Sequence, residues 1–168
     1  MGPLEAFLAT WTQARQTYGQ DSPVGGSPFD GSAKLRSLQA DVDSAAPGTH
    51  WSGGAADTYA ARNAEHAQVL GKLTDLDAQL AAEIDESAKI VASGRAELDR
   101  LRAWVVSAAS SVPENPAGEA MAMAIVAKGM RQLTEVMVRS DGELNAVGAR
   151  IQQIGAQYSA LGVQKFAP

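Results

Sequence analysis

The sequence predicts an all-α protein, an elongated helical bundle of long antiparallel helical hairpins joined at a Trp-x-Gly turn. Alanine is abundant, whereas aromatic residues make up only 5% of the chain and β-branched residues are few. This composition favours helices that pack closely through small side chains over a sheet. Two long stretches also carry apolar residues at alternating spacings of three and four, which is the pattern of a helix seam.

The first third of the chain predicts two shorter helices, over residues 3–18 and 32–46. Pro3 suits the first helical turn, and Glu5 favours the positive end of the helix. Residues 19–31 are rich in glycine and proline and are expected to form a loop. In the second helix the residues expected to face inward are Leu35, Leu38 and Val42.

The rest of the chain predicts two long helices, over residues 54–110 and 116–162, within a single helical domain spanning 1–168. Asn115 and Pro116 have the order of an N-cap followed by proline at the first helical position. In the third helix the seam contains Leu70, Leu73, Leu80, Ile84, Val91, Leu98, Leu101 and Val105, interrupted by Asp77, Ser87 and Gly94. In the fourth it contains Val126, Met130, Leu133, Met137, Ser140, Leu144, Val147, Ile151, Ile154, Tyr158 and Leu161. Residues 163–168 are expected to form a short tail.

Charge and motif content argue against several classes of function. The net charge is −5, and the 14 basic residues are scattered, so a nucleic-acid surface is not expected. Cysteine is absent, and His50 and His66 lack the spacing of a metal pair, so no metal site is expected. Without a His-based dyad or a phosphate-binding loop, we expect no enzyme activity and no cofactor.

Membrane insertion and conventional export are not expected either. The longest nearly apolar run, residues 120–127, is far shorter than the roughly 20 residues that span a bilayer. The N-terminus lacks a basic region followed by an apolar stretch, so a conventional secretory signal is not expected.

The candidate functional residues fall into two groups. The first group forms the turn motif at the break between the second and third helices and comprises Trp51, Gly53, Tyr59 and Asn63. Trp51 is interpreted either as a plug that closes the hairpin end or as an exposed contact for a partner. The second group comprises candidate partner contacts on the fourth helix, namely Met121, Met123, Leu144, Val147, Ile151, Ile154 and Tyr158. Methionine lines adaptable binding surfaces, and an uncovered apolar seam would seek a partner.

Residues 46–59, APGTHWSGGAADTY, followed by Asn63 and His66, resemble the EspA/EspE-type substrates of type VII (ESX) secretion, within the wider Trp-x-Gly superfamily of helical hairpins. The similarity continues through residues 73–80 and returns weakly at 122–126. The resemblance implies a virulence-associated protein that is made in the cytoplasm and is then secreted or held at the cell envelope through type VII secretion. Its expected partners are a helical-hairpin protein or a second copy, together with the secretion machinery or a chaperone.

The sequence departs from this family pattern at the export signal. Type VII substrates or their paired partners carry Tyr-x-x-x-Asp/Glu, but Tyr18, Tyr59 and Tyr158 are followed four positions later by Ser22, Asn63 and Gly162. A partner or a further C-terminal region would then supply the signal. The alternative that the sequence leaves open is the N-terminal export domain of a longer toxin or effector, whose activity lies outside this segment.

Overall fold

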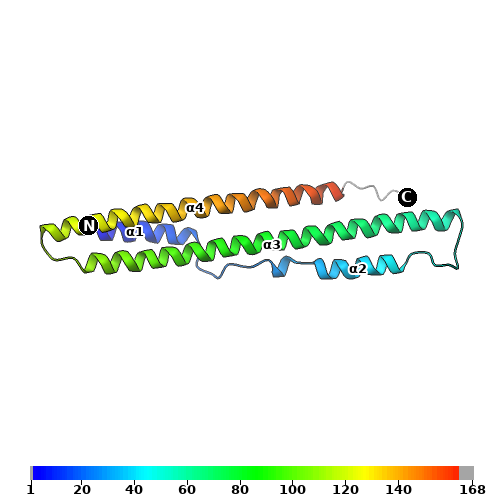
Figure 1. The fold of residues 1–168 in the computed structure, drawn as a ribbon, viewed down its shortest axis with the longest axis horizontal. Coiled ribbons are helices and arrows are strands. Elements are labelled where there is room, and N and C mark those ends of the chain that lie inside the picture. Colours follow the sequence, from blue (N-terminus) through cyan, green and yellow to red (C-terminus); the bar gives the residue numbers. More distant parts are fainter. Residues whose placement is uncertain (1, 163–168) are drawn as a thin grey trace. The chain divides into compact units, whose positions relative to one another are not determined.

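The computed structural model describes residues 2–162 and is helical, as the composition predicts (Figure 1). Its elements are α1 (Pro3–Thr17), the short 3₁₀ helix η1 (Ser27–Phe29), α2 (Ser32–Ser44), α3 (Gly54–Ser110) and α4 (Pro116–Gly162). Within this range there is no strand, and the prediction of an all-α bundle is confirmed. The expected tail, residues 163–168, lies outside the described residues.

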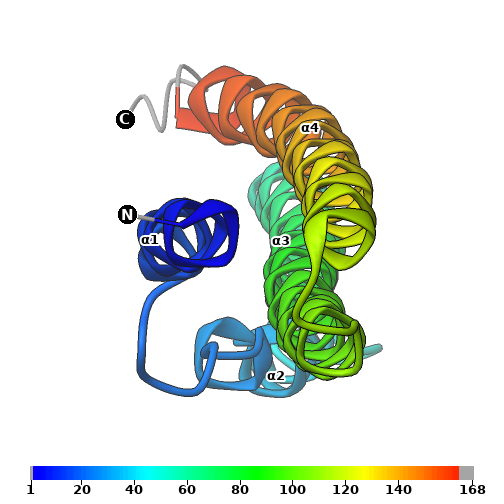
Figure 2. The ribbon, with the colours of Figure 1, turned by 90° about the vertical axis from the view of Figure 1, so that its left-hand side faces the viewer.

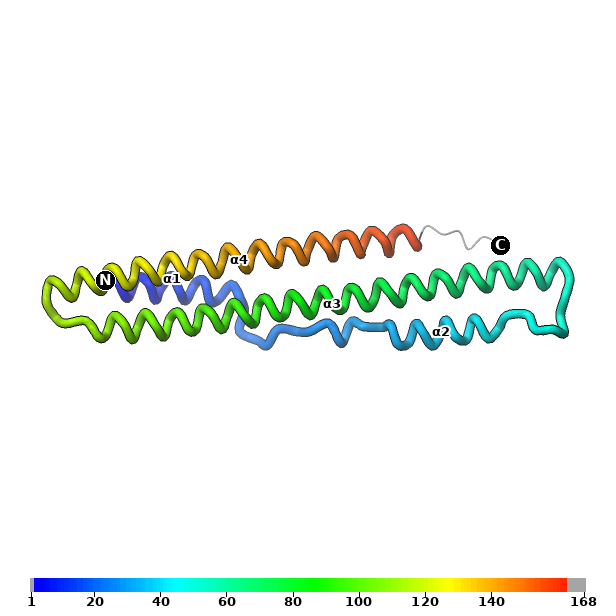
Figure 3. Tube along the Cα trace, viewed as in Figure 1, coloured from blue at the N-terminus to red at the C-terminus, as the bar shows by residue number. Residues whose placement is uncertain are grey.

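The helix ends follow local sequence signals. Asn115 caps α4, because its side-chain Oδ1 accepts the backbone N–H of Gly118 at 2.8 Å. The turn between Ser111 and Asn115 then reverses the chain, as the trace in Figure 3 shows. Two details differ from expectation: α2 ends at Ser44 rather than at residue 46, and η1 lies inside the predicted loop. The early end of α2 agrees with Pro47, because the residue before a proline disfavours helical backbone.

The chain divides into two compact units. The first unit contains Met1–Val24 and Glu86–Val147, and the second contains Gly25–Asp85 and Gly148–Pro168. Whether they unfold together as the single expected domain stays a prediction.

The first unit has a continuous apolar core in which α1 lies beside α3 and α4 (Figure 2). Phe7, Leu98 and Val105 are fully buried and come from α1 and α3. Gly129 of α4 provides space for Phe7 and Val105, because a Cβ atom at this position would lie 2.6 Å from Val105 Cγ2 and 3.1 Å from Phe7 Cε2. The buried members of this core are Phe7, Ala14, Tyr18, Leu98, Leu101, Val105, Leu133 and Val136.

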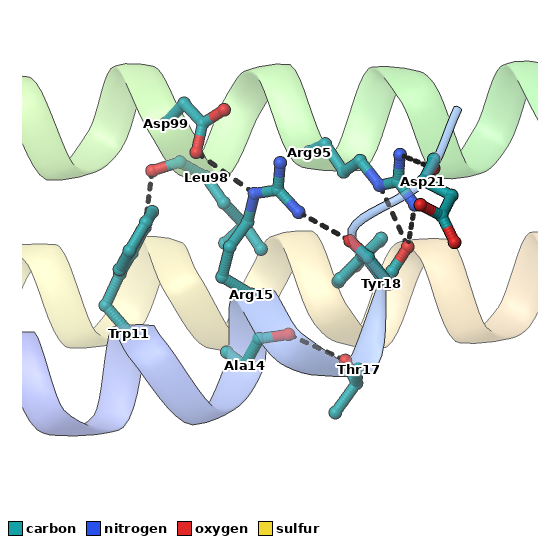
Figure 4. A network of polar contacts seen from close by, with 10 residues as sticks. Trp11, Ala14, Arg15, Thr17, Tyr18, Asp21, Arg95, Leu98 and Asp99 are labelled. Carbon is teal, nitrogen blue, oxygen red and sulfur yellow. Dashed lines mark hydrogen bonds and ion pairs between the residues drawn. The ribbon is translucent and has the colours of Figure 1, made fainter. Parts of the chain in front are cut away.

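A network of hydrogen bonds connects the C-terminal end of α1 to α3 (Figure 4). Arg95 Nε donates to the Tyr18 carbonyl oxygen at 2.8 Å, and its Nη1 donates to the Asp21 carbonyl oxygen at 2.5 Å. Trp11 Nε1 donates to the Leu98 carbonyl oxygen at 2.7 Å. The bond from Arg95 satisfies the Tyr18 carbonyl at the C-cap of α1, where the helix supplies no donor. Together the three bonds set the position at which α1 stops on α3.

Gly94 explains one of the seam interruptions in α3. A Cβ atom there would lie 2.4 Å from Tyr18 Cε1 and 3.1 Å from Ser140 Oγ. The absent side chain therefore makes room for the ring of Tyr18, a residue that is only 9% exposed.

The second unit has a thinner core, built largely from small residues. Its buried members are Gly26, Ser32, Ala56, Ala67, Thr74, Leu76, Ala81 and Ile154. The chain before α2 lies directly on α3, since Gly26 donates its backbone N–H to Asp85 Oδ1 at 2.5 Å and a Cβ atom at Gly26 would overlap the Ala81 carbonyl. Small side chains on α3 thus permit close approach instead of providing a large apolar area.

The packing of α2 corrects one expectation. Leu38 was predicted to face inward, but 42% of it is exposed. The half-buried positions of α2 include Leu35, Gln39 and Val42, and the Gln39 amide lies against Gly71 of α3. Leu38 lies at the flank of this stripe, because the stripe follows the three- and four-residue spacing of a helix face.

We predict opposite effects for two glycine-to-alanine substitutions in the first unit. Gly142→Ala should stabilise the protein by about 0.5–1 kcal/mol, because alanine is the better helix former and a Cβ atom there meets nothing within 4 Å. Gly94→Ala should destabilise it by about 1–2 kcal/mol, because overpacking against the Tyr18 ring outweighs the gain in helix propensity. Urea unfolding of both variants provides the test, and equal stabilisation by the two would contradict the packing described for Gly94.

Candidate interaction sites

The Trp-x-Gly turn lies in the second unit, between α2 and α3. Gly53 has φ of +107°, a conformation that residues with a Cβ atom rarely adopt, so it permits the sharp entry into α3. Its carbonyl oxygen accepts the Asp57 backbone N–H at 3.0 Å, as the first helical bond of α3. The Trp51 backbone N–H points back to the Gly48 carbonyl at 3.4 Å. Backbone geometry therefore places Trp51 immediately before the helix.

Trp51 and Tyr59 form an exposed aromatic pair at this turn. Their ring centroids are 5.4 Å apart and the rings are tilted by 50°, which is a favourable aromatic geometry. Trp51 remains 48% exposed and Tyr59 42% exposed. Of the two interpretations of Trp51, the structure therefore agrees with the exposed residue and not with a buried plug.

Asn63 connects α3 to the end of α2. Its Nδ2 donates to the Val42 carbonyl oxygen at 2.6 Å. This carbonyl belongs to the last turn of α2 and also accepts the Ala45 backbone N–H at 3.2 Å. An amide at this position can donate to the Val42 carbonyl, whereas an ionised carboxylate cannot.

The candidate contacts on α4 differ in accessibility. Met121 and Met123 are 53% and 61% exposed, but successive helical residues turn by about 100°, so the two point to opposite flanks. Leu144, Ile151 and Tyr158 are half-buried, as expected of seam residues. Val147 and Ile154 are only 2% and 5% exposed, so these two candidates belong to the packed interior and are not accessible to a partner.

Tyr158 has a specific role inside the second unit. Its hydroxyl donates to Asp77 Oδ1, which explains why a carboxylate interrupts the α3 seam. Burial of the ring and this hydrogen bond raise the pKa of Tyr158 well above its ordinary value. Asp77 Oδ2 also lies beside Gly31, where a Cβ atom would come within 2.5 Å. One side chain of α3 thus contacts both α4 and the start of α2, where a negative charge is favoured by the helix dipole.

Over the described residues 2–162 there is no group of three or more His, Cys, Asp or Glu side chains arranged to hold a metal ion. Within the same range, no helix combines the length and the apolar character needed to cross a membrane.

Two features of the first unit were not anticipated from the sequence. Trp104 is 39% exposed, with Lys128 Nζ 5.1 Å from the centre of its ring. An apolar groove of about 530 Å³ also opens where α1 ends. Its lining residues are Thr17, Tyr18, Val91, Met137, Val138, Ser140, Asp141 and Leu144. The interruptions at Gly94 and Ser140 mark this region in the sequence, but the groove itself depends on where α1 stops.

The EspA/EspE family model matches residues 18–100. This segment belongs to the EspA/EspE family. No curated protein and no solved structure matches the chain. The EspA/EspE match covers α2, the turn motif and most of α3, which confirms the resemblance carried by the Trp-x-Gly region.

The matched range differs from the expected range at both ends. It begins at residue 18 rather than 46, so it includes α2 and the chain preceding it. It stops at residue 100, so the weak similarity at residues 122–126 lies outside it. The EspA/EspE family is one of type VII secretion substrates and not a known enzyme family. The family match thereby supports the expectation of a type VII secretion substrate.

We predict that asparagine-to-aspartate substitutions will have different effects at two positions. Asn63→Asp should destabilise the protein by about 1–3 kcal/mol, because the carboxylate cannot donate to the Val42 carbonyl and lies at the negative end of α2. Asn115→Asp should be nearly neutral, because the cap of α4 uses a side-chain oxygen as acceptor and aspartate provides one. Urea denaturation at pH 7 measures both, and equal losses would contradict the assigned roles.

We also predict a defined pH dependence for the Tyr158–Asp77 hydrogen bond. The folded state holds Tyr158 neutral and raises its pKa above the unfolded value of 10.0. Its contribution to stability is therefore complete below about pH 10 and decreases as the pH rises further, because the unfolded state ionises first. The difference in urea midpoint between the wild type and Tyr158→Phe should be constant from pH 7 to 9 and shrink above pH 10. A difference that grows in alkali would contradict this sign.

Proposed function

We propose that this chain is a type VII secretion substrate that docks a helical partner protein through the surface at its Trp-x-Gly turn. The observation that carries the proposal is the exposed pair of Trp51 and Tyr59. Tryptophan and tyrosine are enriched among residues that dominate binding energy, since each provides a large rigid area at low entropic cost. Gly53 and the first turn of α3 hold the pair in place without burying it.

The partner also provides the export signal in this proposal. None of the three tyrosines is followed by the acidic residue of Tyr-x-x-x-Asp/Glu. Asn63 stands at the corresponding position after Tyr59, but its amide is engaged with α2. A helical-hairpin partner that carries the complete signal would direct the pair to the secretion machinery, and the exported protein would be released or remain at the cell envelope.

The proposal is tested by Trp51→Ala, with Trp104→Ala as the matched control. Trp51→Ala should cost about 1 kcal/mol of folding stability, well below the roughly 3–5 kcal/mol of a buried aromatic. It should weaken partner binding by about 30-fold or more, the effect of losing a contact worth about 2 kcal/mol, and abolish export. Trp104→Ala removes a tryptophan of similar exposure outside the turn and should retain both activities.

The measurements are the affinity for small helical-hairpin proteins encoded with the same secretion system and the amount of protein in the culture filtrate. Wild-type binding and export by Trp51→Ala would overturn the proposal. A large loss of stability in that variant would instead indicate that the ring is part of the core.

A further inference from the structure

The groove at the end of α1 lies entirely within the first unit and is distinct from the Trp-x-Gly turn. Its volume is about 530 Å³. Val91 of α3 and Met137, Val138 and Leu144 of α4 supply its apolar surface. Val138 is 66% exposed, so an apolar side chain of the groove faces solvent.

The groove exists because α1 stops before the apolar surface of α3 and α4 does. The chain turns at Gly19, which has φ of +75°, and Arg95 holds the Tyr18 and Asp21 carbonyls. These contacts end α1 at the edge of the groove. The chain that follows turns away from the direction of the α1 axis. The side chains of α3 and α4 that line the groove therefore lack the cover that α1 provides to the rest of the core.

The groove is continuous with the interface that already binds a helix. Val91 and Met137 pack against the core formed with α1, and the same two residues line the groove. The surface that accepts Phe7, Trp11 and Tyr18 from α1 thus extends past the end of that helix. An occupant that follows the same line would be a second amphipathic helix.

The charges around α1 indicate which residues such a helix needs. Arg15 of α1 pairs with Asp99 at the rim of its own binding surface, with Arg15 Nε 3.1 Å from Asp99 Oδ1. Asp141 is the charged residue among those lining the groove, and its Oδ2 lies 3.4 Å from the Asn145 amide. A basic side chain on the incoming helix would complete this site as Arg15 does for α1.

We infer that this groove docks one amphipathic helix of a partner protein, with an apolar stripe against Val91, Met137 and Val138 and a lysine or arginine toward Asp141. The inference rests on the proposed function, since it gives the helical partner a second point of contact. It specifies the chemistry of that contact as one apolar helix face with a basic flank.

The test uses the full chain with ¹³C-methyl methionine and a stapled 15-residue peptide that has a leucine stripe and flanking lysines. The peptide should shift the Met137 methyl resonance and leave those of Met121 and Met123 in place. The same peptide with glutamates in place of lysines should bind several-fold more weakly, on the order of fivefold. Asp141→Asn should remove most of this difference between the two peptides.

Two variants of equal charge provide the control. Val138→Asp should lower the affinity for the lysine peptide about tenfold or more, because it places a carboxylate in the apolar stripe. Met123→Asp changes the net charge by the same amount at a residue of similar exposure outside the groove, and it should bind the peptide as the wild type does. Both side chains are exposed, so neither substitution disturbs the core.

Three results would overturn the inference. They are an unshifted Met137 resonance, equal peptide binding by the Val138→Asp and Met123→Asp variants, and concentration-dependent self-association that Val138→Asp abolishes, which would make a second copy the occupant. Failure here is distinguishable from failure of the proposed function. Partner capture that depends on Trp51 but is unaffected by Val138→Asp would refute the groove alone.

Discussion

The positions at which the seams of α3 and α4 stop being apolar determine where the shorter elements pack. At Gly94 the missing side chain admits the Tyr18 ring, and the neighbouring Arg95 binds the carbonyls at the end of α1. At Asp77 a carboxylate accepts the Tyr158 hydroxyl and lies beside the start of α2. A seam of uniform leucine would offer neither a recess nor a polar anchor. Each of these non-apolar seam residues reduces the apolar contact between α3 and α4. In return it provides a specific contact for α1 or α2.

The two units obtain their cohesion in different ways. The first has large buried side chains, with Phe7, Leu98 and Val105 at its centre. The second depends more on close backbone approach and on individual hydrogen bonds, such as those made by Asp85 and Asn63. Because alanine and glycine bury little apolar area, such a unit gains less from the hydrophobic effect per residue. Single polar contacts therefore carry a larger share of its organisation, and that of Asn63 lies one helical turn after Tyr59 of the exposed aromatic pair.

The EspA/EspE match and the two proposed contacts concern different parts of the chain. The matched residues 18–100 include the Trp-x-Gly turn, which is the basis of the proposed partner surface. The groove depends mainly on α4, beyond the matched range, and on the end of α1. A partner that used both contacts would bind the Trp-x-Gly turn, which lies in the part matched by the family. It would also bind the groove, which depends mainly on helices outside that part. The separation makes the two contacts independently testable by surface substitutions.

The sequence by itself determined the helices, the seams and the turn, because these depend on spacing, capping and backbone preference within a few residues. The predicted seam of α4, from Val126 to Leu161, is buried or half-buried throughout, although it omitted the buried Val136 and Gly129. Periodicity could not decide whether Trp51 was a plug or a surface residue, nor that Val147 and Ile154 were inaccessible, because those outcomes depend on which helix covers each face. The donor role of Asn63 and the groove beyond Tyr18 likewise required tertiary structure. Both arise where residues distant in sequence meet, and the spacing of residues along one helix carries no information on where another helix ends against it.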